Sequence, residues 1–411
     1  MTKLDPQRTP WMQARPLARV MAALGGEARY VGGAVRNTLM GREVKDIDIA
    51  TPLVPQEVTR RLETAGLKAV PTGIEHGTIT AVADGEPYEV TTLRRDVETD
   101  GRRAVVAFAT DWKEDAARRD FTINALYATA DGEIFDYHNG LADLKEGRVR
   151  FVGDAVTRIR EDYLRILRLF RFHAWYGKGE IDSVALKASA AEKAGLAKLS
   201  GERIAQEFLR LLEAENPLPV LRTMAATGIL SEIIPATLDM TRLERLCAID
   251  ANNFFAPDPV LRLAALLGHD ETLAASVAER FRLSNKDRAR LEDLAGAKEK
   301  IVSYLTPHEV RKFVYRLGVD RFSDRVSLRW AADPKASNAI QWRALREVAK
   351  TWPRPVFPLT GRDVMNAGVP EGPLVGQILS EVEEWWIDAD FTDDEFSLAE
   401  RLKAVVQATA Y

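Results

Sequence analysis

The chain has 411 residues, of which 46% are hydrophobic and 29% charged, and its formal net charge is −4. This composition predicts two to four compact units and excludes a protein that coats nucleic acid non-specifically, although a local basic groove stays open. The single Cys247 excludes an intramolecular disulfide, and without an apolar run that could span a membrane we expect a cytoplasmic protein with no membrane partner. The polar residues 1–15 lack the apolar core of a signal peptide and are expected to form a short arm.

The first distinctive feature is a glycine turn. Tyr30-Val31 leads into Gly32 and Gly33, and residues 34–40, which include Arg36, are expected to start a helix. A helix N-terminus behind a glycine turn offers free backbone N–H groups to phosphate oxygens. The turn therefore predicts a phosphate cradle with an arginine beside it.

A pair of carboxylates follows the turn. Residues 46–50 alternate acidic and apolar side chains, which is a strand pattern. This alternation puts Asp46 and Asp48 on one face and Ile47 and Ile49 on the other. Paired carboxylates beside a phosphate cradle are the ligands that Mg²⁺-assisted phosphoryl chemistry needs.

The rest of the chain changes character near residue 150. Before that point strand and helix signals mix, and the expected strands lie at 78–82, 88–92, 105–108 and 133–136. The polar segment Arg94 to Arg103 is expected to be a mobile loop whose basic residues could touch RNA or nucleotide. From residue 154 to about 350 the pattern is helical almost throughout. Residues 352–358 are predicted to form a proline-rich linker, followed by a final helix with Trp385-Trp386.

The run from Val31 to Thr51 resembles the first motif of the tRNA nucleotidyltransferase and poly(A) polymerase family, which belongs to the polymerase-beta-like nucleotidyltransferases. Asn37 departs from the pattern, because family members usually carry Asp there to brace the turn. An asparagine can still accept a hydrogen bond, so the departure leaves the chemistry in place.

The resemblance implies an α+β fold. A nucleotidyltransferase head, with a mixed sheet and helices, is expected to precede an all-helical neck, body and tail of bacterial-eukaryotic type. The expected boundaries give a head over 1–145, a neck that recognises the nucleotide base over 146–212, and two RNA-binding parts, the body over 213–350 and the tail over 351–411.

Two further segments of the head match family motifs. Residues 76–80 and 89–94 look like the segment in which the family carries its third carboxylate, here Glu89. The run from Arg119 to Ala125 resembles the second motif, which implies nucleotide binding by Arg119, Asp120 and Asn124, with Asp120 helping to read the ribose 2′-OH. A carboxylate left without that hydroxyl partner disfavours a deoxyribonucleotide.

A charged run in the neck resembles the family's Glu-Asp-x-x-Arg motif, which serves as a protein template. Asp162, Arg165 and Arg168 recur near the helical period and are expected along one side of a helix. The resemblance implies that Asp162 accepts from the exocyclic amine of cytosine or adenine while Arg165 donates to the ring acceptor. Guanine and uracil would set a carbonyl against Asp162, a costly mismatch. Arg168 and Arg171 would face the triphosphate or stabilise the helix.

Two more segments are interpreted as structural. Residues 136–143 resemble the family's third motif, a hinge between head and neck, and His138 is expected to be a loop residue rather than a base. Residues 201–207 resemble the last motif and are expected to brace the neck helices.

Together these motifs imply an enzyme that adds C, C and A to the 3′ end of tRNA from CTP and ATP. Asp46 and Asp48 would hold two Mg²⁺ ions, one activating the tRNA 3′-hydroxyl and the other holding pyrophosphate, with Glu89 as the third catalytic carboxylate. Gly32, Gly33 and Arg36 would position the triphosphate.

Several alternatives stay open. A bacterial poly(A) polymerase shares the head, although residues 76–103 look more like the CCA-adding kind. A partial enzyme that adds only CC or only A is another reading, and the segment Arg94 to Arg103 argues against the CC-only version. A rival from another class is a catalytically silent RNA-binding protein. Such a scaffold would have no need of all five of these residues: Asp46, Asp48, Arg119, Asp162 and Arg165. A phosphohydrolase appendage is discounted, because His269-Asp270 stands alone.

Overall fold

The computed structural model describes residues 3–100, 103–391 and 394–409. Contacts within the chain divide it into two compact units, residues 1–237 with 276–284, and residues 238–275 with 285–411. No helix in these described ranges is long and apolar enough to cross a membrane. The four-part division expected from the sequence stays a prediction, and each unit is described by itself.

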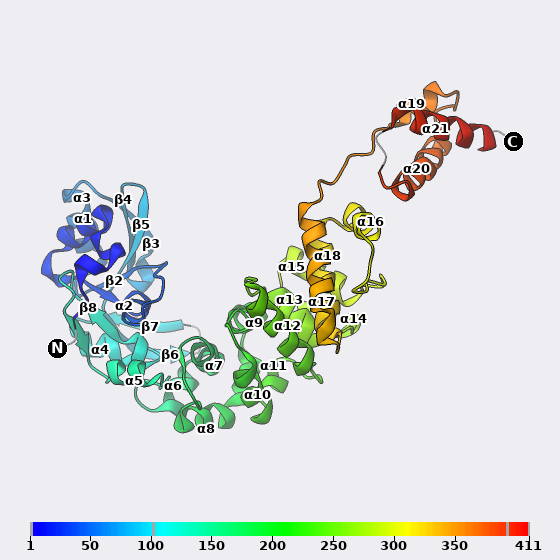
Figure 1. Cartoon of the computed structure of the whole chain (residues 1–411). Helices are drawn as coiled ribbons and strands as arrows, with labels where there is room; N and C mark the ends of the chain where they lie inside the picture. Colours follow the sequence, from blue (N-terminus) through cyan, green and yellow to red (C-terminus); the bar gives the residue numbers. More distant parts are fainter. Residues whose placement is uncertain (1–2, 101–102, 392–393, 410–411) are drawn as a thin grey trace. The chain divides into compact units, whose positions relative to one another are not determined.

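The first unit holds a seven-stranded mixed sheet, as the expected fold class requires (Figure 1). The strand order is β3-β4-β5-β2-β1-β8-β9, in which only β2 and β5 run parallel. The strands predicted at 78–82 and 88–92 appear as β4 and β5, in which buried side chains alternate with more exposed ones. The strands are β1 (Arg29–Val31), β2 (Asp48–Thr51), β3 (Lys68–Gly73), β4 (Thr78–Ala83), β5 (Glu86–Thr92), β8 (Leu126–Ala128) and β9 (Ile134–Asp136).

Helices of the head bury their apolar stripes on this sheet. α1 (Arg15–Leu24) and α3 (Pro55–Thr64) contact each other and β4, with Leu17 and Leu62 fully buried. α2 (Gly33–Leu39) contacts β1 and β8, so the helix behind the glycine turn is anchored on two interior strands of the sheet. Two short helices, α4 (Trp112–Ala117) and α5 (Gly140–Glu146), complete the head.

The prediction of a loop between Arg94 and Arg103 is wrong for the residues that the structure describes, because they form strands. β6 (Arg94–Asp100) and β7 (Arg103–Phe108) pair antiparallel as a separate two-stranded hairpin, and residues 101–102 lie outside the described residues. The sequence of β6 is almost entirely polar and so carries a loop-like signal, whereas the strand predicted at 105–108 lies within β7.

The neck departs from prediction at Asp162. The charged run is not one helix: α6 (Ala155–Glu161) ends there, and α7 (Leu164–Tyr176) starts two residues later. Asp162 is extended, with a φ of −155°, and its Oδ1 accepts from the backbone N–H of Leu164 at 3.1 Å. This local hydrogen bond competes with the helical one and starts a new helix instead. The remaining helices that lie wholly in this unit are α8 (Ser183–Ala191), α9 (Gly201–Leu212), α10 (Leu218–Ala226) and α11 (Ile229–Ile233).

The second unit is helical throughout its regular structure (Figure 1). Residues 352–360 form the predicted irregular linker. Trp385-Trp386 lies on α20, but a further helix follows, so the prediction of a final helix there is wrong. Asp390 and Phe391 reverse the chain with positive φ of 56° and 61°, and no glycine marks this break in the sequence. The helices are α12 (Met240–Asn253), α13 (Pro259–Leu267), α14 (Glu271–Arg280, shared with the first unit), α15 (Asn285–Ala295), α16 (Pro307–Leu317), α17 (Val319–Ala332), α18 (Ala339–Thr351), α19 (Gly361–Asn366), α20 (Pro373–Asp388) and α21 (Glu395–Thr409).

Candidate active site

The predicted carboxylates lie at two neighbouring strands of the head sheet. Asp48 is the first residue of β2, and its register partner in the parallel strand β5 is Glu89. Ile49 is fully buried while the side chain of Asp48 is exposed, so the alternation turns Asp48 away from the core. Asp46 precedes the strand by two residues, so only one member of the predicted pair lies on it.

The charges around Asp48 show whether the site suits a divalent cation. Desolvation raises the pKa of Asp48, and the negative charges of Glu89 and Asp46 raise it further, against the opposing effect of Arg119. A bound cation relieves such crowding of carboxylates. Within the described ranges no three His, Cys, Asp or Glu side chains form a metal-binding group. The donor set suits Mg²⁺, which takes one or two carboxylates and completes its shell with water and substrate phosphates.

Gly32 occupies the turn between β1 and α2, with a φ of 63° that favours glycine. A Cβ atom there would stand 3.4 Å from Nη1 of Arg119 and 3.5 Å from the backbone oxygen of Asn124. The close approach therefore brings the first and second motifs together. Gly33 starts the helix that follows.

Arg119 is held in place by two partners. Its Nη2 lies 3.3 Å from Oδ2 of Asp115, and its Nε donates to the hydroxyl of Tyr127 at 3.1 Å. Although burial opposes the charge, Tyr127 and Asp115 keep the pKa of Arg119 above its usual value. Asp115 is only 1% exposed. A cation fixed this way stays charged beside the carboxylates.

Four predicted nucleotide-binding residues form one hydrogen-bonded chain. Arg36 on α2 donates from Nη1 to Oδ1 of Asn124. Asn124 donates to Oδ1 of Asp120 at 2.9 Å, and Arg168 on α7 donates to Oδ2 of Asp120 from both Nε, at 2.8 Å, and Nη2, at 2.5 Å. The structure thus joins the glycine-turn helix, the second motif and the neck.

This series of hydrogen bonds continues to a residue of α9. Nη1 of Arg168 lies 3.4 Å from Oε1 of Glu207, and Nε of Arg171 donates to Oε2 of Glu207 at 2.5 Å. Glu207 therefore anchors both arginines of the charged run, which agrees with the bracing role expected for residues 201–207.

Asp120 already uses its acceptors within the protein. Oδ1 accepts from Asn124 and from the backbone N–H of Phe121 at 2.8 Å, and Oδ2 accepts twice from Arg168. Burial alone would raise the pKa of this carboxyl, but Arg168 and Asn124 bring it down to about 2. A ribose 2′-OH would have to displace one of these four hydrogen bonds.

Asp162 and Arg165 are not partners of each other. Asp162 accepts from Nη2 of Arg203 at 2.7 Å and remains 25% exposed, which leaves its carboxylate open to a further donor. Arg165 donates to Glu161 and, at 2.7 Å, to the backbone oxygen of Arg158. Asp162 and Arg165 therefore do not lie along one side of a single helix as expected, and each is held by different neighbours.

The segment resembling the third motif has a structural arrangement. The carboxylate of Asp136 accepts from the backbone N–H groups of His138, Gly140 and Leu141, at 3.2, 2.9 and 2.9 Å, and so caps the start of α5. Burial lowers the pKa of His138, against the effect of Asp136. This agrees with His138 as a loop residue.

Sequence reasoning missed several partners in the site. Asp115 stands four residues before Arg119, and this helical ion-pair spacing could have identified it. Glu207 lies in the segment expected to brace the neck, but its arginine partners were not predicted; its burial on the apolar face of α9, next to Phe208, is an unusual position for a carboxylate. Tyr127 and Tyr176 carry no local signal, because tertiary packing alone brings them to the arginines.

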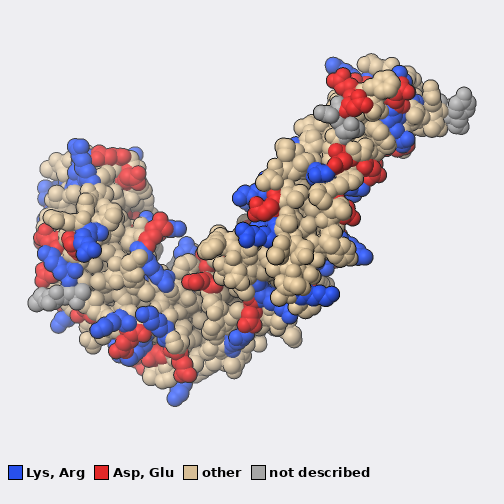
Figure 2. Space-filling model, in the orientation of Figure 1, with Lys and Arg blue, Asp and Glu red and all other residues tan. Residues whose placement is uncertain are grey.

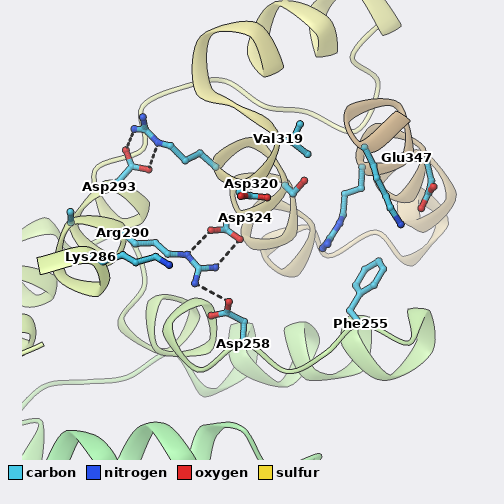
Figure 3. Close-up of a pocket in the computed structure, with 14 residues that line it drawn as sticks. Phe255, Asp258, Lys286, Arg290, Asp293, Val319, Asp320, Asp324 and Glu347 are labelled. Atoms are coloured by element: carbon cyan, nitrogen blue, oxygen red, sulfur yellow. Dashed lines mark hydrogen bonds and ion pairs between the residues drawn. The ribbon is translucent and has the colours of Figure 1, made fainter. Parts of the chain in front are cut away.

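A cavity of about 1010 Å³ lies in the second unit and not at the carboxylates (Figure 3). In it Asp258 and Asp324 hold Arg290, with distances of 2.8 Å for both ion pairs, and Asp293 holds Arg321. None of its lining residues belongs to the predicted nucleotide site. Because of this the nucleotide site is not assigned to the cavity. Figure 2 shows basic and acidic side chains interspersed on the molecular face.

Known protein families match two segments of this chain, and known relatives match it over nearly its whole length. Residues 28–150 match the family described as "Poly A polymerase head domain", and residues 180–240 match "Probable RNA and SrmB- binding site of polymerase A". CCA tRNA nucleotidyltransferase 1, mitochondrial, of Mus musculus is 34% identical, covering 95% of this chain and 89% of that protein. The CCA-adding enzyme of Levilactobacillus brevis is 32% identical, covering 90% of this chain and 92% of that protein.

Solved structures share the fold. The Bacillus stearothermophilus CCA-adding enzyme in complex with CTP aligns with a TM-score of 0.73 and 25% identity over 97% of this chain and 100% of that one. The Thermotoga maritima CCA-adding enzyme complexed with tRNA aligns over 100% of both chains with a TM-score of 0.67 and 22% identity. The similarity to full-length relatives, together with the head motifs, shows that this chain belongs to the tRNA nucleotidyltransferase and poly(A) polymerase family.

Proposed function

We propose that the chain is a CCA tRNA nucleotidyltransferase, which adds C, C and A to the 3′ end of tRNA from CTP and ATP without a nucleic-acid template and releases pyrophosphate. The observation that carries this proposal is the juxtaposition of Asp48 and Glu89 on paired strands, with Arg119 acting on Asp48 and approaching the Gly32 turn together with Asn124. The relatives that match nearly the whole chain carry the same activity in their names.

Different residues of the head bind the metal ion and the triphosphate. Asp46 and Asp48 would hold Mg²⁺, which supplies charge neutralisation at the phosphates and activation of the attacking hydroxyl. Backbone N–H groups at the Gly32 turn and the guanidiniums of Arg36 and Arg119 bind the triphosphate. Because Arg119 is locked by its neighbours, it needs no reorganisation when charge develops on the phosphates.

Base selection is proposed for the neck. Asp162 keeps free acceptor capacity beside Arg203, and Arg165 has two terminal nitrogens on a guanidinium that its neighbours orient. An acceptor next to a donor matches the edge that cytosine and adenine share. Arg168 and Arg171 support the site from the neck, since Arg168 pairs with Asp120 and Glu207 and Arg171 pairs with Glu207.

The helical parts that follow the neck are assigned to tRNA. The body and tail are proposed to bind tRNA through its shape and backbone, and the cytoplasm is proposed as the place of action. The alternative with the most support is a poly(A) polymerase, because a family description that the head matches names that activity.

Variants of the paired carboxylates test the proposed site. Asp46→Ala and Asp48→Ala are expected to abolish incorporation of labelled CTP and ATP into tRNA lacking its 3′ end, while tRNA binding in a filter assay stays near wild type. Asp131→Ala, at an exposed turn of the same head, is the matched control and should keep wild-type activity. Full activity in either of the first two variants at saturating Mg²⁺ would exclude the two-carboxylate site.

A further inference from the structure

The buried carboxylate of Asp115 on α4 uses its two oxygens for different parts of the head. Oδ1 accepts from the backbone N–H of Arg94 at 3.1 Å and from Nε of Arg118 at 2.8 Å. Oδ2 accepts from the hydroxyl of Tyr127 at 2.6 Å and lies 3.3 Å from Nη2 of Arg119. Although burial opposes ionisation, Arg119 and Arg118 lower the pKa of Asp115, so the group is an anion at neutral pH.

The contact with Arg94 lies at the root of the hairpin β6–β7, whose two strands pair only with each other. Leu93, just before the hairpin, is fully buried; its N–H donates to the backbone oxygen of Thr51, and its own oxygen accepts from the N–H of Ala109, both at 2.8 Å. Arg94 is the first residue of β6, and its N–H is directed at α4. The side chain of Asp115 therefore helps to set the direction in which the hairpin leaves the head.

Arg119 receives its orientation from the other oxygen. Its Nε donates at 3.1 Å to the Tyr127 hydroxyl, which in turn donates to Oδ2 of Asp115. Its Nη1 is the nitrogen that approaches the glycine turn, since a Cβ atom at Gly32 would stand 3.4 Å from it. Two nitrogens of the guanidinium are thus held from the side of Asp115, while the third faces the proposed phosphate cradle.

We infer that Asp115 is a positioning residue whose two oxygens have separate tasks. Oδ2 sets the orientation of Arg119 towards the nucleotide triphosphate, and Oδ1 fixes the hairpin β6–β7 to the same helix. The first task rests on the proposed function, because it assumes that Arg119 binds the triphosphate. The second rests on the contact with Arg94 alone.

The substitution D115N separates the two tasks, because an amide offers one acceptor and one donor group. Its oxygen belongs at the position of Oδ1, where an NH₂ group would face the donors of both Arg94 and Arg118. The NH₂ group then takes the place of Oδ2 and faces Arg119, which loses its charged partner. D115N should therefore keep the root of the hairpin and release Arg119.

The released arginine should change binding and turnover in opposite directions. With the competing carboxylate charge gone, equilibrium dialysis should show CTP bound about threefold more tightly, whereas kcat should fall about tenfold because the guanidinium is no longer held in position. In an R119A background D115N should change neither quantity, since it acts through Arg119. Y127F keeps the charge of Asp115 but removes the hydroxyl between the two groups, so it should lower kcat without tightening CTP binding.

A second pair of variants tests the hairpin. R94P removes the backbone N–H at the first residue of a strand, where proline is tolerated, and R94A removes the side chain but keeps the N–H. Hydrogen exchange in residues 95–100 and 104–108 should be about fivefold faster in R94P than in R94A, the effect of roughly one hydrogen bond, and should stay at the wild-type rate in D115N. E114Q neutralises an exposed acid of the same helix and should leave exchange, CTP binding and rates unchanged. Thermal unfolding midpoints confirm that the variants are folded.

The outcomes decide the two tasks separately. Wild-type CTP affinity and kcat in D115N would overturn the role at Arg119, as would weaker CTP binding that persists in the R119A background. Equal exchange in R94P and R94A, or accelerated exchange in D115N, would overturn the role at the hairpin. If the wild-type chain adds no nucleotide to tRNA, the proposed function fails, yet CTP binding and hydrogen exchange still support or overturn the role of Asp115.

Discussion

At the scale of single residues, Asp120 makes the head sensitive to acid. Its folded pKa of about 2 lies below the ordinary value of 3.8. A depressed pKa contributes stability that is fully present above about pH 4 and is lost as the pH falls towards 2. The difference between the two pKa values corresponds to about 2 kcal/mol. Because this carboxylate links Asn124 to Arg168, its protonation should loosen the junction between the second motif and the neck.

Asp120→Asn tests this contribution. We expect the variant to be less stable than wild type at pH 7 and to lose less stability between pH 4 and pH 2, because it has no proton to gain. Thermal unfolding followed by circular dichroism across this range gives the comparison, with the exposed Asp131→Asn as control. Parallel acid profiles for wild type and Asp120→Asn would show that Asp120 titrates normally.

Base selection is the second prediction for single residues. Asp162→Ala should relax the rejection of UTP and GTP, because the clash of two acceptors disappears, while Arg165→Ala should weaken the use of CTP and ATP together. A mispaired hydrogen bond in a buried site costs about 1–3 kcal/mol, roughly a tenfold to hundredfold change in discrimination. Incorporation of each nucleotide onto tRNA ending at the discriminator base measures it.

Arg160 supplies a control on the same charged run, since its side chain is 64% exposed and pairs with Glu192. Arg160→Ala should keep wild-type selectivity. If Asp162→Ala and Arg165→Ala also keep it, base choice is made elsewhere in the site.

At the scale of elements, one buried acid connects two neck helices. Glu207 on α9 holds Arg168 and Arg171 on α7. Removing a buried carboxylate leaves two cations without it, a loss of about 3 kcal/mol for a buried ion pair. Glu207→Ala should therefore lower the midpoint of thermal unfolding and reduce nucleotide addition through Arg168. Glu202→Ala, which removes a 53% exposed acid from the same helix, should change neither quantity.

The elements also show what sequence patterns can predict. β2, β4 and β5 follow from alternation along each strand, and α2 follows from the glycine turn. β6 and the break at Asp162 do not, because the sequence of β6 is almost entirely polar and the break depends on a single side-chain hydrogen bond. Within the site, Arg36, Asp120 and Asn124 are predicted by motif, while Tyr176, which holds Arg36, and Glu207, which holds Arg171, come from distant segments and require the tertiary structure.

At the scale of the whole molecule, the two compact units have different roles in the proposal. The first carries every predicted catalytic and nucleotide-binding residue, and the second is proposed to bind tRNA. With a net charge of −4, the chain relies on local basic contacts to RNA, so tRNA affinity should fall as salt rises. Filter binding between low and moderate salt measures this slope, and an affinity independent of salt would contradict backbone recognition.

The most direct test of the central claim is the sequence of the product. Purified protein is incubated with Mg²⁺, CTP, ATP and a tRNA that ends at its discriminator base, and the extended 3′ ends are sequenced. The proposal predicts that extension stops after three nucleotides, read as CCA, and that CTP alone gives no terminal A. A long tract of A would identify a poly(A) polymerase, extension by CC or A alone a partial enzyme, and bound but unextended tRNA a silent RNA-binding protein. Each of these three results would contradict CCA addition by this chain.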